Sequence, residues 1–388
     1  MTGAVGSEVT LRVVDDWREV LAMGPAWNRL LAESPQRANV FLTHEWFRAW
    51  WEGFGEGRVP QVVTLHAGGR LIGIAPLMRS RVSYHGLPVR LLSLIANDHT
   101  NRCELILAER PRECVEAVLD FVRRQAPRWD MAELDFLPAD SPTARGVAEA
   151  AAAYGLACGE RPSYRSPFIP LEGTWESFYG GLDGRFRRNL RNREKRLAAL
   201  GPVTYEDHPS TLHAALQEMF VVGERSWKGE AKTALGSTPA LCRFYTRLAE
   251  LAEPRGELSL HVLRVGGKAI AFHYSLRTNG TVHLLKTEYD TDYHPYSPGH
   301  QIQKRVLEAC YARGMREFDF LGPDMEWKRE WASRVRPHVR LLLFHGGPRS
   351  RLLAFLELRA KPALKQSKLV RWLRRTEPVD VTAEATCS

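Results

Sequence analysis

The chain contains two stretches in which apolar runs flank a pair of glycines. In the first half these are Gln61–His66, Gly68-Gly69 and Arg70–Met78, and in the second half Leu258–Val265, Gly266-Gly267 and Lys268–Leu276. Apolar runs rich in β-branched residues predict strands, and a glycine pair tolerates the positive φ of a tight turn. Each stretch therefore predicts a β-hairpin. An aromatic-rich helical pattern precedes each one, at 43–53 and 239–252.

A second pair of matching segments lies downstream of the hairpins. Glu133–Pro138 resembles Glu317–Gly322, and both read as a buried strand that runs into a turn. A helical pattern precedes each segment, at 110–124 and 299–313. The order of elements agrees between the halves while their spacing differs, which predicts a duplicated domain with altered loops. Short apolar matches also arise by coincidence, so that alternative stays open.

The second half predicts a complete small domain. Its third strand, Thr281–Glu288, follows the turn signal Asn279-Gly280. A loop rich in Pro and Tyr comes next, then the helix near Gly299 and a final strand, Arg316–Leu321. The predicted fold class is α/β (α+β), with a mixed, mostly antiparallel sheet flanked by helices.

Length and composition favour a globular chain of two to three domains. The 388 residues are 44% hydrophobic and 26% charged, which is enough to bury cores. No apolar run approaches the roughly 20 residues that span a bilayer, and the N-terminus does not look like a secretion signal. The six cysteines form no CxxC pair, so no metal site is expected and a reducing cytoplasm fits best.

The net charge of +9 is concentrated in two segments. Residues 185–196 hold seven basic residues and one acid, and residues 349–375 hold nine basic residues and one acid. Local basicity of this kind predicts particular anionic contacts rather than a general affinity for nucleic acid.

The loop before the Gly299 helix gives the chain a family resemblance. Tyr293–His300 leads through that helix and Gly314 to the strand at Glu317–Phe320, followed by Glu326-Trp327-Lys328. This order resembles the GNAT acyltransferase superfamily, and in particular the CelD-like acetyltransferases associated with polysaccharide biosynthesis. Phe41–Trp51 is similar to the early helix of that family. The resemblance covers about residues 40–335 and extends to Fem-type aminoacyltransferases, which are tandem GNAT proteins.

The resemblance implies a division of the chain into three parts. Residues 1–165 would form a degenerate GNAT-like domain, 166–345 a GNAT domain with the acyl-donor site, and 346–388 a basic amphipathic tail. In the superfamily the pyrophosphate of acetyl-coenzyme A rests at the helix start, which here consists of Tyr296, Ser297, Pro298, Gly299, His300 and Gln301. A helix N-terminus suits an anion because its N–H groups and dipole point toward it. An ordinary Pro-Gly helix start is the alternative.

Direct acyl transfer requires a base for the acceptor's proton and a donor for the oxyanion. Glu288, at a predicted strand end, is the first candidate for the base, since partial burial raises a carboxyl pKa. Lys328 matches the aromatic-Lys position of the family and is the candidate for the oxyanion. Asp319 is a third catalytic candidate, although a structural pairing explains it equally well.

Several residues are candidates for acceptor binding, each with an alternative. They are Trp227, Lys228, His273, Asp290 and Arg188. His273 would also fit as a buried core histidine, and Arg188 as part of a solvated helix. If Arg188 and its basic neighbours are functional, they would hold the phosphates of a nucleotide-linked or lipid-linked acceptor.

The sequence therefore predicts an enzyme that transfers acetyl from acetyl-coenzyme A to an amine or hydroxyl of a sugar or cell-envelope precursor. The alternatives are a Fem-type transferase that uses aminoacyl-tRNA, or a non-catalytic binding protein on a degenerate GNAT pair. No other nucleic acid is expected as a partner. Residues 349–375 predict peripheral contact with the inner membrane face, or else packing against the body of the protein.

Overall fold

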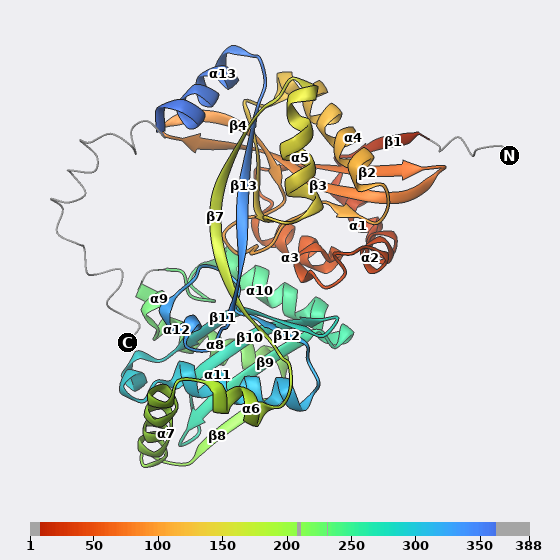
Figure 1. Cartoon of the computed structure of the whole chain (residues 1–388). Helices are drawn as coiled ribbons and strands as arrows, with labels where there is room; N and C mark the ends of the chain where they lie inside the picture. The colour runs from red at the N-terminus through yellow and green to blue at the C-terminus, as the bar shows by residue number, and fades with distance from the viewer. Residues whose placement is uncertain (1–7, 208–210, 231, 362–388) are drawn as a thin grey trace. The chain divides into compact units, whose positions relative to one another are not determined.

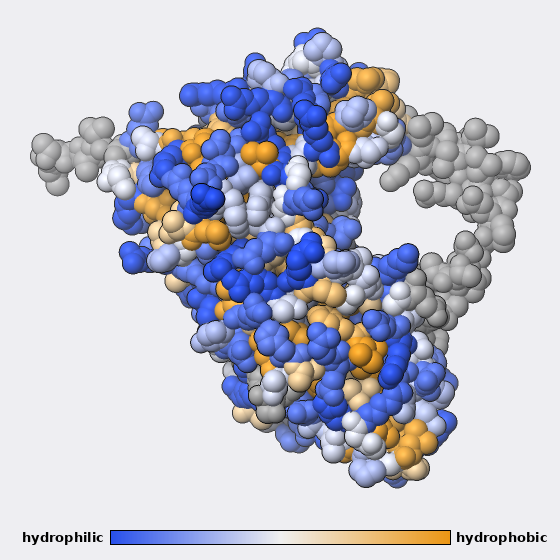
Figure 2. All heavy atoms as spheres, turned by 180° about the vertical axis from the view of Figure 1, so that it is seen from behind, coloured by the Kyte–Doolittle hydropathy of each residue, from blue (hydrophilic) through white to orange (hydrophobic). Residues whose placement is uncertain are grey.

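A computed structural model describes residues 8–207, 211–230 and 232–361 (Figure 1). The chain divides by its contacts into two compact units. Among the described residues, one unit takes in 8–36, Gly57–Tyr164 and 337–361, and the other takes in Arg37–Glu56 and Arg165–Arg336. The chain passes between the units inside the strands β7 (Ala157–Pro170) and β13 (Arg334–Phe344). Figure 2 shows hydrophobic side chains as separate patches among hydrophilic ones.

The first unit is a mixed sheet in the order β1-β2-β3-β4-β6-β13-β7. The β4–β6 pair is parallel, whereas β1–β2, β2–β3, β3–β4 and β6–β13 are antiparallel. Besides β7 and β13, its elements are β1 (Val9–Val14), α1 (Trp17–Ala22), α2 (Gly24–Glu33), β2 (Val59–Ala67), β3 (Arg70–Tyr84), β4 (Leu87–Leu94), β5 (Ile106–Leu107), α4 (Pro111–Arg124), η2 (Ala126–Arg128), β6 (Met131–Pro138), α5 (Pro142–Ala150), η3 (Ala151–Tyr154), α13 (Pro348–Phe355) and the π-helical turn η6 (Leu356–Ala360).

The second unit carries the sheet β7-β12-β11-β10-β9-β8. Its β11–β12 pair is parallel, and its other neighbouring pairs are antiparallel. Its elements are η1 (Val40–Leu42), α3 (His44–Phe54), α6 (Trp175–Gly181), α7 (Gly184–Ala198), β8 (Val203–Asp207), α8 (Leu212–Glu224), α9 (Trp227–Glu230), α10 (Pro239–Ala252), η4 (Glu253–Arg255), β9 (Leu258–Val265), β10 (Lys268–Thr278), β11 (Thr281–Tyr289), η5 (Thr291–Tyr296), α11 (Pro298–Ala312), β12 (Glu317–Asp319) and α12 (Glu326–Arg329).

Both units contain the same sequence of elements, and the predicted fold class is confirmed. β2–β3–β4, α4 and β6 repeat as β9–β10–β11, α11 and β12, and each time the last strand runs parallel to the third. The glycine pairs make the predicted hairpin turns, with φ of 57° and 77° at Gly68 and Gly69 and 56° and 82° at Gly266 and Gly267. The repeat extends to the helix starts, where Arg110 and Ser297 have left-handed φ of 47° and 50° and each precedes a proline.

Helices cover both faces of the second unit's sheet. α11 packs its Ile302 and Val306 with Ala271 of β10, whereas Tyr245 of α10 contacts Tyr274 of the same strand. Ala271 and Tyr274 are three residues apart, so they point to opposite faces. The sheet is therefore buried on both sides, which explains its continuous apolar strands.

The helix α3 belongs to the second unit, although residues 1–165 were expected to form one N-terminal domain. Trp46 of α3 meets Phe244 of α10 edge to face, with ring centroids 5.2 Å apart. Glu52 of α3 pairs with Arg247 of α10 at 2.9 Å. An amphipathic pattern predicts that a helix buries one face, but it does not identify the surface against which that face packs.

Candidate active site

The strand β11 has an open edge. It pairs with β10 along its whole length, from Thr281 to Tyr289, but with β12 only from Thr281 to His283. Among the strands that the structure describes, none pairs with Leu284–Tyr289 on the β12 side. The register with β10 also shifts at Leu285, which bends the strand locally. The sheet therefore opens beyond His283, and backbone groups along that opening can bind an extended ligand.

A lysine lies on each side of this opening. Lys228 of α9 donates from Nζ to the carbonyl oxygen of Thr287, in the open part of β11, at 2.9 Å. Lys328 of α12 donates from Nζ to the carbonyl oxygens of Leu321 and Pro323, on the segment after β12, at 2.6 and 2.8 Å. Trp227, next to Lys228, has its ring centroid 5.8 Å from the Lys228 Nζ. The opening thus has an ammonium group at each border.

Glu288 is buried on the face of β11 that α8 covers. Burial raises its pKa, while the charges of Lys228 and Lys286 act in the opposite direction. Its carboxylate accepts the backbone N–H of Leu235 at 3.2 Å. A Cβ at Gly223 of α8 would lie only 2.6 Å from Oε2 of Glu288, so glycine permits this close approach. Glu288 is therefore a carboxyl group whose proton affinity is shifted toward neutral pH.

Two lysines of this region, Lys286 and Lys328, are easier to deprotonate than ordinary lysines. Burial, together with the charge of Lys228, lowers the pKa of Lys286 to about 8 and that of Lys328 to about 7. Sequence analysis did not select Lys286. It lies two residues from Glu288 in β11 and therefore on the same face, which is the signal that could have identified it.

The helix start after η5 offers fewer free donors than expected. His300 and Gln301 both donate their N–H to the Ser297 carbonyl at 3.1 Å, and Pro298 has no N–H. The Gly299 N–H has no acceptor among the residues that the structure describes. A Cβ at Gly299 would make only ordinary contact with Tyr289, at 3.5 Å, so packing within the protein does not require glycine there.

The basic helix α7 supplies positive charge next to this loop. Arg193 donates to the Ser297 hydroxyl at 2.5 Å, and the Arg196 guanidinium lies 5.4 Å from the centre of the Tyr296 ring. Four further basic side chains of α7 are exposed and form no ion pair within the described part of the chain: Arg185, Arg188, Arg191 and Lys195. A phosphate-bearing ligand at the α11 start would therefore meet one backbone N–H and a cationic helix.

Comparison with known proteins shows which family this region is similar to. Residues 184–329 match the family described as "Acetyltransferase (GNAT) domain". This segment is similar to GNAT domains, and the match covers less than half of the chain. The protein is therefore a transferase, and the expected superfamily resemblance is confirmed at that level. No curated protein matches the chain.

Solved structures share the fold over most of the chain at low sequence identity. "Crystal structure of FemX" has 12% identity and a TM-score of 0.58, covering 86% of this chain and 98% of that one. "The structure of L-PGS from Bacillus licheniformis" has 12% identity and a TM-score of 0.51, covering 92% and 97%. "Tandem GNAT protein from the clavulanic acid biosynthesis pathway (without AcCoA)" has 12% identity and a TM-score of 0.50, covering 88% and 99%. These similarities show the fold alone.

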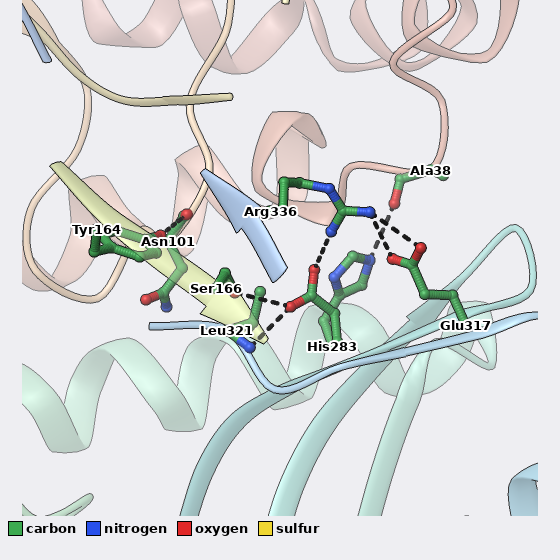
Figure 3. Close-up of polar contacts among 9 residues, drawn as sticks. Ala38, Asn101, Tyr164, Ser166, His283, Glu317, Leu321 and Arg336 are labelled. Carbon is green, nitrogen blue, oxygen red and sulfur yellow. Dashed lines mark hydrogen bonds and ion pairs between the residues drawn. The ribbon is translucent and has the colours of Figure 1, made fainter. Parts of the chain in front are cut away.

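Asp319 also lies in the segment 184–329, but it is buried and fully engaged in an ion-pair cluster. Figure 3 labels its partners Ser166, Leu321 and Arg336. Its Oδ1 accepts the Ser166 hydroxyl at 3.2 Å and the Leu321 N–H at 2.9 Å, and its Oδ2 accepts Arg336 at 2.9 Å. Glu317 accepts the same guanidinium at 3.0 Å. These contacts hold β7, β12 and β13 together. We therefore assign Asp319 a structural role and keep Glu288 and Lys328 as the catalytic candidates.

Asp290 is likewise occupied by protein groups. It is buried, pairs with Lys268 at 2.8 Å and Arg225 at 3.8 Å, and accepts the Asp292 N–H at 3.1 Å. The cap fixes the start of η5, so Asp290 shapes the loop rather than facing an acceptor.

Two histidines named in the sequence analysis, His273 and His300, lie in this segment; His273 is buried and His300 is partly buried. His273 lies on the α11 face of β10 with neither ring nitrogen hydrogen-bonded among the described residues, and burial strongly lowers its pKa. His300 accepts the Trp331 indole N–H at 3.0 Å and lies 3.2 Å from the carboxylate of Glu330. Burial lowers the pKa of His300 to about 4, so both rings are neutral at pH 7. Gln301 is also tied into the protein, since its amide donates to the Tyr296 carbonyl at 2.8 Å.

Within the described ranges, no group of three or more His, Cys, Asp or Glu residues is arranged to hold a metal ion. No helix in those ranges is long and apolar enough to cross a membrane.

Proposed function

We propose that the protein transfers an acyl group, as acetyl from acetyl-coenzyme A, to an amine or hydroxyl of an acceptor. The observation that carries the proposal is the open edge of β11 with Lys228 and Lys328 at its borders. The amide groups of a pantetheine arm can hydrogen-bond to an unpaired strand edge as another strand would. A thioester held there would lie near two ammonium groups.

Glu288 is proposed as the general base. Its carboxylate takes the proton from the acceptor amine or hydroxyl as the nucleophile attacks the thioester carbonyl. The carbon–sulfur bond then breaks, and the coenzyme leaves as a thiolate that takes up a proton. A buried carboxylate with a raised pKa matches the proton affinity that general-base catalysis needs near neutral pH.

Lys328 is proposed to stabilise the oxyanion. Its ammonium group is buried, so its charge interacts strongly with an oxygen that becomes negative. The two carbonyl oxygens that it contacts keep the side chain in position before the substrate binds. Lys228 would bind the acceptor or the thioester at the opposite border.

The residues at the start of α11 fit the phosphates of the coenzyme in a modified form. The Gly299 N–H can bind one phosphate oxygen, and the charge comes from Arg193 and Arg196 of α7 rather than from a full turn of backbone N–H groups. Arg188, further along the same helix, would hold an additional phosphate of the donor or the acceptor.

For the acceptor, we propose a sugar or cell-envelope precursor in the cytoplasm, following the resemblance to CelD-like acetyltransferases. The alternative is a Fem-type transfer from aminoacyl-tRNA. The unpaired cations of α7 favour that alternative, because a row of basic side chains can bind several phosphates of a nucleic-acid backbone.

Calorimetric titration tests the choice of donor. We expect acetyl-coenzyme A to bind and Arg193→Ala to weaken its binding, with Arg29→Ala, at an exposed position in the other unit, as the control. Binding of aminoacyl-tRNA alone would favour the Fem-type function. Binding of neither donor would leave a non-catalytic GNAT pair and overturn the proposal.

A further inference from the structure

The last described helix, α13, is held firmly against the first unit. Leu353 is buried in an apolar cluster with residues of β4, β6 and β13. Leu358 of η6 packs so closely over Gly159 that a Cβ there would overlap its side chain. The buried carboxylate of Glu357 accepts the Tyr84 hydroxyl at 2.7 Å and pairs with Lys361. One side of α13–η6 is therefore fixed by packing and hydrogen bonds.

The opposite side of α13 presents apolar side chains to solvent. Leu352 is 52% exposed and Phe355 is 55% exposed. They lie three residues apart, so they are neighbours on the same helix face. Because Leu353 and Glu357 fix the rotation of the helix, the two side chains cannot turn into the unit's own core.

Basic residues surround this apolar pair. Arg349, Arg351 and Arg359 are exposed and form no ion pair with any described acid. The sequence continues in the same manner beyond the described residues, with Lys365, Lys368, Arg371, Arg374 and Arg375 near Leu369, Trp372 and Leu373. Exposed apolar side chains flanked by unpaired cations match a surface that is negatively charged outside and apolar beneath.

We propose that the exposed face of α13, formed by Leu352, Phe355, Arg349, Arg351 and Arg359, docks on an anionic membrane surface. Leu352 and Phe355 enter the boundary between headgroups and acyl chains, and the arginines bind lipid phosphates. The enzyme would then work at the membrane without a spanning helix in the described residues, and its acceptor could be lipid-linked.

Vesicle flotation of the full chain tests the docking. We expect binding to phosphatidylcholine vesicles that contain phosphatidylglycerol, little binding to phosphatidylcholine alone, and release at high salt. Leu352→Ser/Phe355→Ser should lower the bound fraction at least about fivefold, and Arg349→Ser/Arg351→Ser should lower it and weaken its salt dependence.

Leu200→Ser is the matched control, because Leu200 is 51% exposed and also lies near a basic helix, α7. It should leave vesicle binding unchanged. Equal flotation of Leu352→Ser/Phe355→Ser and the wild type would overturn the proposal, as would absence of binding by the wild type. A lowered melting temperature of that double variant would also overturn it, since it would mean that the chain itself covers the two side chains.

Discussion

Asp135 and Asp319 have equivalent partners in the two units, a serine of β7 and an arginine of β13. Asp135 accepts the Ser163 hydroxyl of β7 at 2.7 Å and Arg340 of β13 at 2.6 Å. Asp319 accepts Ser166 of β7 and Arg336 of β13, at 3.2 and 2.9 Å. Each aspartate also accepts the backbone N–H of a residue that follows it, Phe136 or Leu321. In each unit, β7 therefore contributes a serine and β13 an arginine to the aspartate.

This repetition predicts that Asp319 contributes to stability rather than to catalysis. Asp319→Asn should lower the free energy of unfolding by about 2–4 kcal/mol, because it leaves the partly buried Arg336 with one carboxylate. Asp135→Asn should cost less, about 1–2 kcal/mol, since the side chain of Arg340 is 41% exposed compared with 22% for Arg336. Urea unfolding measures both. Loss of turnover by Asp319→Asn with unchanged unfolding would return it to the catalytic candidates.

Glu288→Gln should remove the base without unfolding the chain. We expect kcat to fall at least about 100-fold, because the amide keeps the shape of the side chain but cannot take the acceptor's proton. Steady-state kinetics with acetyl-coenzyme A measure this fall. Glu308→Gln, at a half-exposed position of α11, should retain wild-type turnover. Near wild-type kcat in Glu288→Gln would exclude it as the base.

The pH–rate profile should be bell-shaped. Turnover rises as Glu288 loses its proton, and it falls above about pH 7 as Lys328, whose pKa is about 7, loses its charge. The positive charge of Lys228 lowers the pKa of both groups, so Lys228→Met should move both limbs to higher pH. An unshifted profile in Lys228→Met would show that the limbs belong to other groups.

Arg188→Glu tests the cationic face of α7. Because Arg188 is exposed and unpaired among the described residues, reversing its charge should raise KM for the phosphate-bearing substrate about fivefold and leave kcat unchanged. The effect should diminish with added salt. Arg29→Glu, an exposed charge reversal in α2, is the control. Equal KM values in the two variants would assign α7 to the solvated surface.

The parts of the fold that depend on local signals were predictable. Glycine pairs and Asn279-Gly280 mark turns through their backbone freedom, so the strands at 258–265, 268–276 and 281–288 agree closely with β9, β10 and β11. In the first half, the predicted strands Gln61–His66 and Arg70–Met78 likewise fall within β2 and β3. The predicted amphipathic tail can be compared with the structure only as far as Lys361, because Leu369, Trp372 and Leu373 lie outside the described residues.

The parts that depend on tertiary contacts were not predictable. The spacing from Glu288 places Lys286 on the same strand face, but the burial and the charge of Lys228 that lower its pKa come from tertiary contacts. Asp290 and Asp319 stand at strand ends, as catalytic carboxylates often do, and only their partners assign them to capping and ion pairing. Sequence position identifies where a carboxylate can act, whereas burial and neighbouring charges decide what it does.

The packing of α3 in the second unit affects how the chain can fold while it is being translated. The ribosome makes Trp46 about 200 residues before its partner Phe244, and it makes β6 about 200 residues before its partner β13. Neither unit can therefore finish folding during translation until these later partners have emerged from the ribosome. Any truncation near residue 165 would give one fragment with an orphaned tryptophan-rich helix and another lacking its cover.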